Sequence, residues 1–135
     1  MSFVDDCTIF NLPKIDANNG NITSLNNGRD LPFDIKRVFY IYDVPSGELR
    51  GAHAHYKCHQ LLVAVTGSFK VEVFDGLNSK VFDLNRPNCG LHIPPGIWAS
   101  ELDFSGGAVC LVLASEEFDE CDYIRDFNEY LIFKK

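Results

Sequence analysis

His53 and His55 are the residues of this 135-residue chain whose type and spacing could do chemistry. They lie one residue apart in a segment that reads as a strand, so side-chain alternation places both imidazoles on one face. Gln60 begins the apolar stretch 60–66, and its amide would join the two rings in a compact polar cluster. Polar groups on an apolar sheet face need hydrogen-bond partners or a function. The cluster therefore predicts an active site.

Proton transfer is the chemistry that this histidine pair suits best. An imidazole, whose unperturbed pKa is about 6.5, can accept and return a proton near neutral pH. The alternative is a pair of core histidines satisfied by their neighbours. A lone histidine would favour that alternative, whereas two on one face beside Gln60 favour a catalytic site.

Further side chains near the pair could bind a ligand. Arg37 and Arg50 flank it in sequence, and a guanidinium fork matches two phosphate oxygens, with surface ion pairing as the alternative. Tyr40 and Tyr42 share a strand face from which a hydroxyl could reach the pocket. Trp98 could stack on a base or a sugar ring, or could serve packing alone.

Short strands separated by turns must position these residues. Segment 35–42 is dense in β-branched and aromatic residues and is the strongest strand signal. The apolar residues of the tail, 116–135, approach helical spacing and predict a short C-terminal helix. The pattern predicts one all-β domain over residues 1–135, a sandwich or barrel. Other strands are expected within 1–12, around the histidines, and at 60–66, 68–75, 80–84, 91–93, 98–104 and 108–114.

Composition narrows the possible partners and the compartment. The net charge of −7 argues against a nucleic-acid partner but permits an anionic small ligand, which needs only a local basic cluster. No apolar run approaches the roughly 20 residues of a membrane span. Five widely spaced cysteines and an N-terminus without a secretory signal predict reduced thiols in a cytoplasmic protein.

Two groups of residues resemble the paired motifs of the cupin superfamily, a double-stranded β-helix or jelly-roll barrel. Metal-binding cupins supply two histidines and a glutamate from the first motif and a histidine from the second. Here Gln60 and Ala99 occupy the glutamate and second-motif histidine positions, so we expect no metal and no other cofactor. His59 should point to the opposite strand face, whereas His92 stays a possible ligand. The motif residues are Gly47, His53, His55, Gln60 and Gly67, then Gly90, Pro94, Gly96, Trp98 and Ala99.

A closer resemblance rests on segments 35–43 (IKRVFYIYD), 50–55 (RGAHAH), 60–63 and 113–125 (LASEEFDECDYIR). These look like the nucleotide-sugar 3,4-ketoisomerases, cupins that act on dTDP-4-keto-6-deoxyglucose. The resemblance implies a metal-free homodimeric isomerase that moves the ketone from C4 to C3 through an enediol. Its product would lead to 3-amino-3,6-dideoxyhexoses of surface glycans such as lipopolysaccharide O-antigen. Either His53 or His55 would be the base, with the other histidine or a tyrosine such as Tyr40 polarising the carbonyl oxygen. Tyr40 and Arg50 match family positions that line the pocket.

Two departures from these relatives and three alternatives stay open. Relatives often carry an acidic-Arg-Gly turn where this chain has 16–20, and some carry a histidine in place of Ala99. The configuration at C4 of the product, gluco or galacto, is therefore undetermined. The alternatives are a nucleotide-sugar 3,5-epimerase, a non-catalytic sugar-binding cupin and a metal-dependent dioxygenase.

Overall fold

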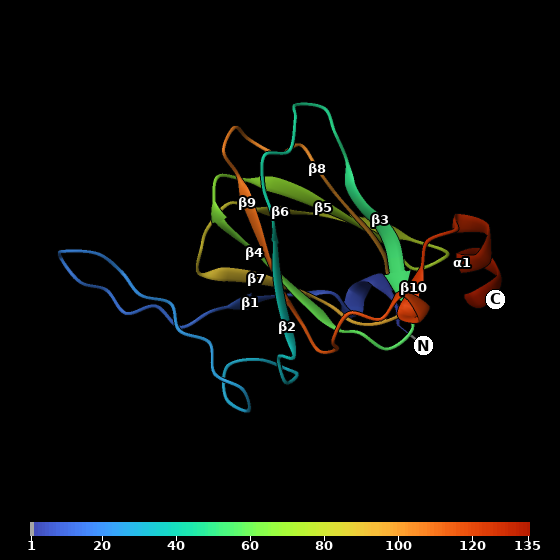
Figure 1. Cartoon of the computed structure of the whole chain (residues 1–135), viewed down its shortest axis with the longest axis horizontal. Helices are drawn as coiled ribbons and strands as arrows, with labels where there is room; N and C mark the ends of the chain where they lie inside the picture. Colours follow the sequence, from blue (N-terminus) through green and yellow to red (C-terminus); the bar gives the residue numbers. More distant parts are fainter. Residues whose placement is uncertain (1) are drawn as a thin grey trace.

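The computed structural model describes residues 2–135, which form two antiparallel five-stranded sheets that face each other (Figure 1). The first sheet has the order β1-β7-β4-β9-β2 and the second β10-β3-β8-β5-β6. This confirms the expected all-β jelly-roll barrel with a short C-terminal helix. The strands are β1 (Thr8–Asn11), β2 (Arg37–Ile41), β3 (Arg50–His55), β4 (Gln60–Thr66), β5 (Phe69–Phe74), β6 (Ser79–Leu84), β7 (Cys89–Ile93), β8 (Trp98–Leu102), β9 (Val109–Ala114) and β10 (Tyr123–Ile124).

The C-terminal tail is less helical than its spacing predicts. Helix α1 covers Phe127–Phe133, and the 3-10 turns η1 (Val4–Asp6) and η2 (Glu120–Asp122) precede β1 and β10. The Asp126 side chain accepts hydrogen bonds from the backbone N–H groups of Asn128 and Glu129, at 2.8 and 3.1 Å. This N-cap fixes where the helix begins. Upstream, the chain pairs with β3 through β10 instead of continuing as helix.

Apolar side chains fill the space between the sheets because each strand alternates its residues between the two faces. On β4, Leu62 and Ala64 pack inward against Val71 and Val112. Leu61 and Val63 point to the outer face, where residues from segment 25–35 cover them. Gln60 shares the inner face with Leu62, so the barrel interior receives the polar residue that begins β4.

Tyr130 attaches α1 to the barrel. Its side chain is fully buried, and its hydroxyl lies 2.9 Å from the carbonyl oxygen of Phe74 and 2.8 Å from that of Gly96. The ring also packs against Trp98, at a centroid distance of 5.4 Å. One side chain therefore joins the helix to the end of β5 and to the loop between β7 and β8.

We expect the substitution Tyr130→Phe to lower the free energy of unfolding by about 1–2 kcal/mol, because the carbonyl oxygens of Phe74 and Gly96 lose the hydroxyl hydrogen that they share. Urea denaturation followed by circular dichroism measures the change. Tyr56→Phe, which removes the hydroxyl of an exposed tyrosine, is the matched control and should stay within about 0.5 kcal/mol. Equal stability of the two variants would contradict the anchoring role of the Tyr130 hydroxyl.

None of the helices described within residues 2–135 is long and apolar enough to cross a membrane.

Candidate active site

A cavity of about 470 Å³ opens into the barrel beside β2, β3 and β10. This volume lies within the range of small-molecule sites, about 300–1,000 Å³. Apolar side chains of β2, β4, β7 and β9 form much of its wall, including Phe39, Leu62 and Val112. Its polar and ionisable lining residues are Tyr40, Tyr42, Asp43, Arg50, His53, Gln60, Glu101, Tyr123 and Arg125.

An irregularity in β3 sets the orientation of the histidine pair. The β3–β8 register shifts between Gly51 and His53, and both Gly51 and Ala52 have positive φ, at 82° and 64°. Beyond this bulge normal alternation resumes, so His53 and His55 face the interior together. Their ring centroids lie 5.1 Å apart and the ring planes are nearly perpendicular, at 86°. The prediction of one shared face is confirmed.

Both ring nitrogens of His55 have partners. Nδ1 lies 3.2 Å from Oδ2 of Asp122, and Nε2 lies 3.4 Å from the side-chain nitrogen of Gln60. The Asp122 side chain also accepts hydrogen bonds from the backbone N–H groups of Lys57 (2.8 Å) and Cys58 (3.2 Å). An acceptor at Nδ1 and a donor at Nε2 select the Nδ1–H tautomer of His55. Burial lowers the pKa of His55, although Asp122 opposes this effect.

His53 is the histidine whose ring lines the cavity. Its Nδ1 is buried and has no hydrogen-bond partner among residues 2–135, which leaves Nε2 as the nitrogen available to a ligand. Burial and, to a smaller extent, the neighbouring His55 lower the pKa of His53 to about 4. The imidazole is therefore neutral at physiological pH and can accept a proton.

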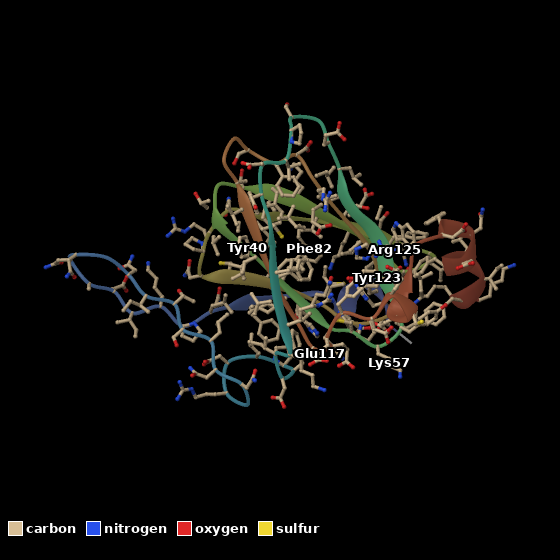
Figure 2. All side chains as sticks on the ribbon, in the orientation of Figure 1. Tyr40, Lys57, Phe82, Glu117, Tyr123 and Arg125 are labelled. Atoms are coloured by element: carbon tan, nitrogen blue, oxygen red, sulfur yellow. The ribbon has the colours of Figure 1, made fainter. Side chains whose placement is uncertain are left out.

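Tyr123 touches both histidines. Its ring centroid lies 4.3 Å from that of His55 and 5.0 Å from that of His53. Its hydroxyl accepts a hydrogen bond from Nη1 of Arg37 at 3.3 Å, and the Arg125 guanidinium lies 4.2 Å from its ring centroid. Figure 2 shows Tyr123 and Arg125 close together beside β10 and β3, whereas Tyr40 lies apart from them at β2.

Sequence reasoning did not select Tyr123, Asp122, Arg125 or Glu101 as site residues. The first three lie in segment 113–125, whose resemblance to known enzymes was the available signal. Their position in the site depends on the pairing of Tyr123 with His55 between β10 and β3. This pairing joins segments far apart in the chain, and local periodicity does not report it.

Four of the predicted ligand-binding residues lie at the cavity, but not all with the expected orientation. Arg50 and Gln60 line it. Tyr40 and Tyr42 border it, yet they are 61% and 59% exposed because Phe39 and Ile41 occupy the inner face of β2. Tyr123 is thus the tyrosine in contact with both histidines, whereas Tyr40 and Tyr42 line the cavity as predicted.

The positions of Arg37 and Trp98 differ more strongly from the predicted positions at the cavity. Arg37 lies on the inner face of β2, where its guanidinium stands over the Phe39 ring and donates to Tyr123. It therefore supports the site from beside the cavity. Trp98 alternates with the inward-facing Ala99 and packs on the outer face against α1, so the structure does not bring its ring to the cavity.

The other histidines lie outside the cavity. Nδ1 of His59 is 3.0 Å from Nε2 of His92, and their stacked rings pack beneath Phe33 on the outer face of the first sheet. The orientation expected for His59 is confirmed. The possibility that His92 acts as a ligand beside His53 is wrong, because His92 pairs in register with the outward-facing Leu61.

One cluster has the ligand types of a metal site: His55, Cys58 and Asp122 offer atoms within 4.8 Å of one another. The polar atoms of these three side chains already form hydrogen bonds with one another or with backbone groups. Asp122 accepts two backbone N–H groups and contacts His55, and the Cys58 thiol donates to the carbonyl oxygen of His59. These hydrogen bonds explain why the three side chains lie close together: the cluster holds the His55 ring in position.

The chain is similar to sugar ketoisomerases over nearly its whole length. Residues 5–135 match the family model described as FdtA: WxcM-like, C-terminal. A TDP-4-oxo-6-deoxy-alpha-D-glucose-3,4-oxoisomerase of Aneurinibacillus thermoaerophilus is 39% identical, covering 90% of this chain and 88% of its own.

Solved structures agree with the family match. A 3,4-ketoisomerase from Helicobacter canadensis superimposes with a TM-score of 0.93 at 43% identity, covering 96% of this chain and 97% of its own. A histidine-to-asparagine mutant of QdtA from Thermoanaerobacterium thermosaccharolyticum was solved in complex with TDP-4-keto-6-deoxyglucose. It superimposes with a TM-score of 0.93 at 39% identity, covering 95% of this chain and 93% of its own. With the family model matching residues 5–135 and relatives about 40% identical over nearly the whole chain, the chain belongs to the WxcM-like FdtA family.

Proposed function

We propose that the protein is a nucleotide-sugar 3,4-ketoisomerase that converts dTDP-4-keto-6-deoxyglucose to the 3-keto sugar. The observation that carries this proposal is His53, a neutral imidazole on the cavity wall beside the fully hydrogen-bonded His55. The similar A. thermoaerophilus protein is named for this activity, and a QdtA mutant binds this sugar nucleotide.

His53 acts as the base in this proposal. Nε2 removes the proton from C3, the carbon next to the ketone, and the electron pair forms the C3–C4 double bond of an enediol. His53 then delivers a proton to C4 while the oxygen at C3 becomes the ketone. No redox partner is needed, because one carbon is oxidised as its neighbour is reduced.

In this proposal Tyr123 transfers protons to and from the oxygen atoms on C4 and C3 of the substrate. Its hydroxyl donates a proton to the C4 oxygen, where negative charge develops, and recovers a proton from the C3 hydroxyl as the new ketone forms. Arg37, which donates to the Tyr123 oxygen at 3.3 Å, stabilises the negative charge on the phenol oxygen during this exchange. His55, held by Asp122 and Gln60, packs against both catalytic rings and fixes their positions.

Arg50 and Arg125 bind the diphosphate in this proposal. Both line the cavity, and Arg50 is exposed while Arg125 is paired with Glu120 through bonds of 2.6 and 3.0 Å. Guanidinium groups match phosphate oxygens in pairs, so two of them suit a diphosphate. They supply the local positive charge that an anionic ligand needs in a chain of net charge −7.

Proton NMR of dTDP-4-keto-6-deoxyglucose with chelator-treated protein in heavy water tests the activity. We expect loss of the C3 proton signal and appearance of a 3-keto species, whose couplings give the C4 configuration. Exchange at C3 and C5 without ketone migration would indicate an epimerase, and no exchange would indicate a binding protein. Activity that needs an added divalent metal would contradict the metal-free mechanism.

We propose that the active protein is a homodimer. Between β1 and β2 the chain leaves the barrel as a long excursion (Figure 1), and its residues Ile15 and Ile22 are exposed. Apart from an isolated β-bridge between these two isoleucines, the residues of this excursion between 13 and 25 form no strand pairing within the described part of the chain. A second copy is the occupant that the resemblance implies, and sedimentation equilibrium measures the mass.

We further propose a cytoplasmic enzyme that supplies surface-glycan biosynthesis. The five cysteines are free thiols, which suits a reducing compartment. A 3-keto sugar is the substrate class that an aminotransferase converts to a 3-amino sugar. Coupling the reaction to such an enzyme, with detection of the amino sugar by mass spectrometry, tests this assignment.

A further inference from the structure

Glu101 is a buried acidic side chain of the cavity wall that the proposed proton transfer does not use. It lies on β8, two residues from the inward-facing Ala99, and is only 7% exposed. It lines the cavity together with His53 and Gln60. Acidic side chains are rarely buried to this extent unless they are paired.

Glu101 has no such pair. Arg50 stands opposite it in the β3–β8 register, yet no side chain of residues 2–135 forms an ion pair or a hydrogen bond with its carboxyl group. The carboxyl lies against the backbone of Gly51, where a Cβ atom would collide with its oxygen Oε2. The glycine at the β3 bulge therefore leaves room for the Glu101 carboxyl next to His53.

We propose that Glu101 contacts the substrate directly, its neutral carboxyl donating a hydrogen bond to an oxygen of the nucleotide-linked hexose. This inference rests on the proposed function and names a residue that selects the sugar part of the substrate. A buried donor without a protein partner is satisfied when a polar ligand enters, which makes the contact selective for hexose oxygens.

The surroundings of Glu101 favour the neutral, protonated form of its carboxyl group. Burial raises the pKa of Glu101 to about 7, against the lowering effects of Arg50 and of its own backbone N–H. A bound diphosphate adds negative charge nearby and raises that pKa further, so binding favours the protonated acid. KM for the substrate should therefore increase as the pH rises through about 7. The other titratable groups facing Glu101 or lining its cavity are Tyr40, Tyr42, Asp43, Arg50, His53, Cys110, Tyr123 and Arg125.

Two variants separate sugar binding from nucleotide binding. Glu101→Leu removes the hydrogen bond at similar volume, whereas Glu101→Gln keeps a neutral donor. We expect Glu101→Leu to weaken binding of dTDP-4-keto-6-deoxyglucose about tenfold by calorimetry while leaving the Kd for TDP within about twofold. We expect Glu101→Gln to bind the sugar nucleotide nearly as the wild type does and to show a KM independent of pH between 6 and 8.

Three outcomes would overturn the assignment. They are unchanged sugar-nucleotide binding in Glu101→Leu, an equal loss of TDP binding, and a pH dependence of KM that persists in Glu101→Gln. If Glu101→Leu fails to fold, the comparison of wild type with Glu101→Gln still decides. A wild-type protein that binds the keto sugar without isomerising it would contradict the proposed function, whereas the binding comparison would continue to test Glu101.

Discussion

Replacing His53 with asparagine is expected to lower kcat by about 10²–10⁴-fold, the contribution typical of a positioned general base. Asparagine is close to imidazole in size and polarity but cannot accept a proton from carbon at neutral pH. The substrate should still bind, with KM changed by less than about threefold, because Arg50, Arg125 and Tyr123 still line the cavity. Single-turnover NMR of the isotope exchange at C3 measures the chemical step directly.

The matched control is His55→Asn, on the same strand face. His55 has partners at both nitrogens, so its loss should disturb the orientation of His53 and Tyr123 and reduce kcat less than the loss of His53. The C3 exchange should slow in His55→Asn but remain measurable. A larger loss in His55→Asn than in His53→Asn would transfer the role of base to His55.

The pH profile provides a second check on His53. A base must be unprotonated to act, and burial lowers the pKa of His53 to about 4. Activity in the wild type should therefore persist below pH 6 and fall only as the pH approaches that value. An acid limb at the ordinary imidazole pKa, about 6.5, would contradict a buried, neutral base.

Strand alternation explains why the sequence located the histidine pair. Two positions separated by one residue share a face whatever the fold around them, and the bulge at Gly51 and Ala52 lies before the pair and leaves this relation intact. Gln60 could be added because it begins β4, whose neighbours Leu61 and Leu62 are strongly apolar. The interior cluster follows from these local rules.

For Tyr40 the same rule could not show which face is exposed, because β2 is apolar or aromatic on both faces. Val38, Tyr40 and Tyr42 lie on one face and Phe39 and Ile41 on the other, so nothing local shows which face is inside. For Trp98 the information was present: Ala99 occupies an interior motif position, and its neighbour must then point outward.

Residues from the C-terminal segment could not be placed from the sequence. Asp122 and Tyr123 reach the histidines through η2 and the two-residue strand β10, which are too short to give a periodic signal. The charge states of the ionisable side chains in the site depend on how far residues from other strands bury them. Neither the support of His55 by Asp122 nor the raised pKa of Glu101 follows from sequence spacing.

Tyr123→Phe is expected to reduce kcat by about 10²–10³-fold with little change in KM. One donor to a developing negative charge is worth about this much. Phenylalanine keeps the ring contacts with His53 and His55 and the position beneath the Arg125 guanidinium, so only the hydroxyl is removed. If Tyr123 protonates the C4 oxygen, the loss must appear in the chemical step and not in substrate binding.

Tyr40→Phe is the comparison that separates the two tyrosines. The Tyr40 ring is largely exposed and packs against Tyr42, at a centroid distance of 5.8 Å, so its hydroxyl should contribute less than about threefold to kcat. Arg37→Met, which removes the donor to the Tyr123 oxygen, should reproduce part of the Tyr123→Phe defect and add little to it in the double variant. A large defect in Tyr40→Phe with none in Tyr123→Phe would contradict the role of Tyr123 and assign the polarisation of the carbonyl oxygen to Tyr40, as expected from the sequence.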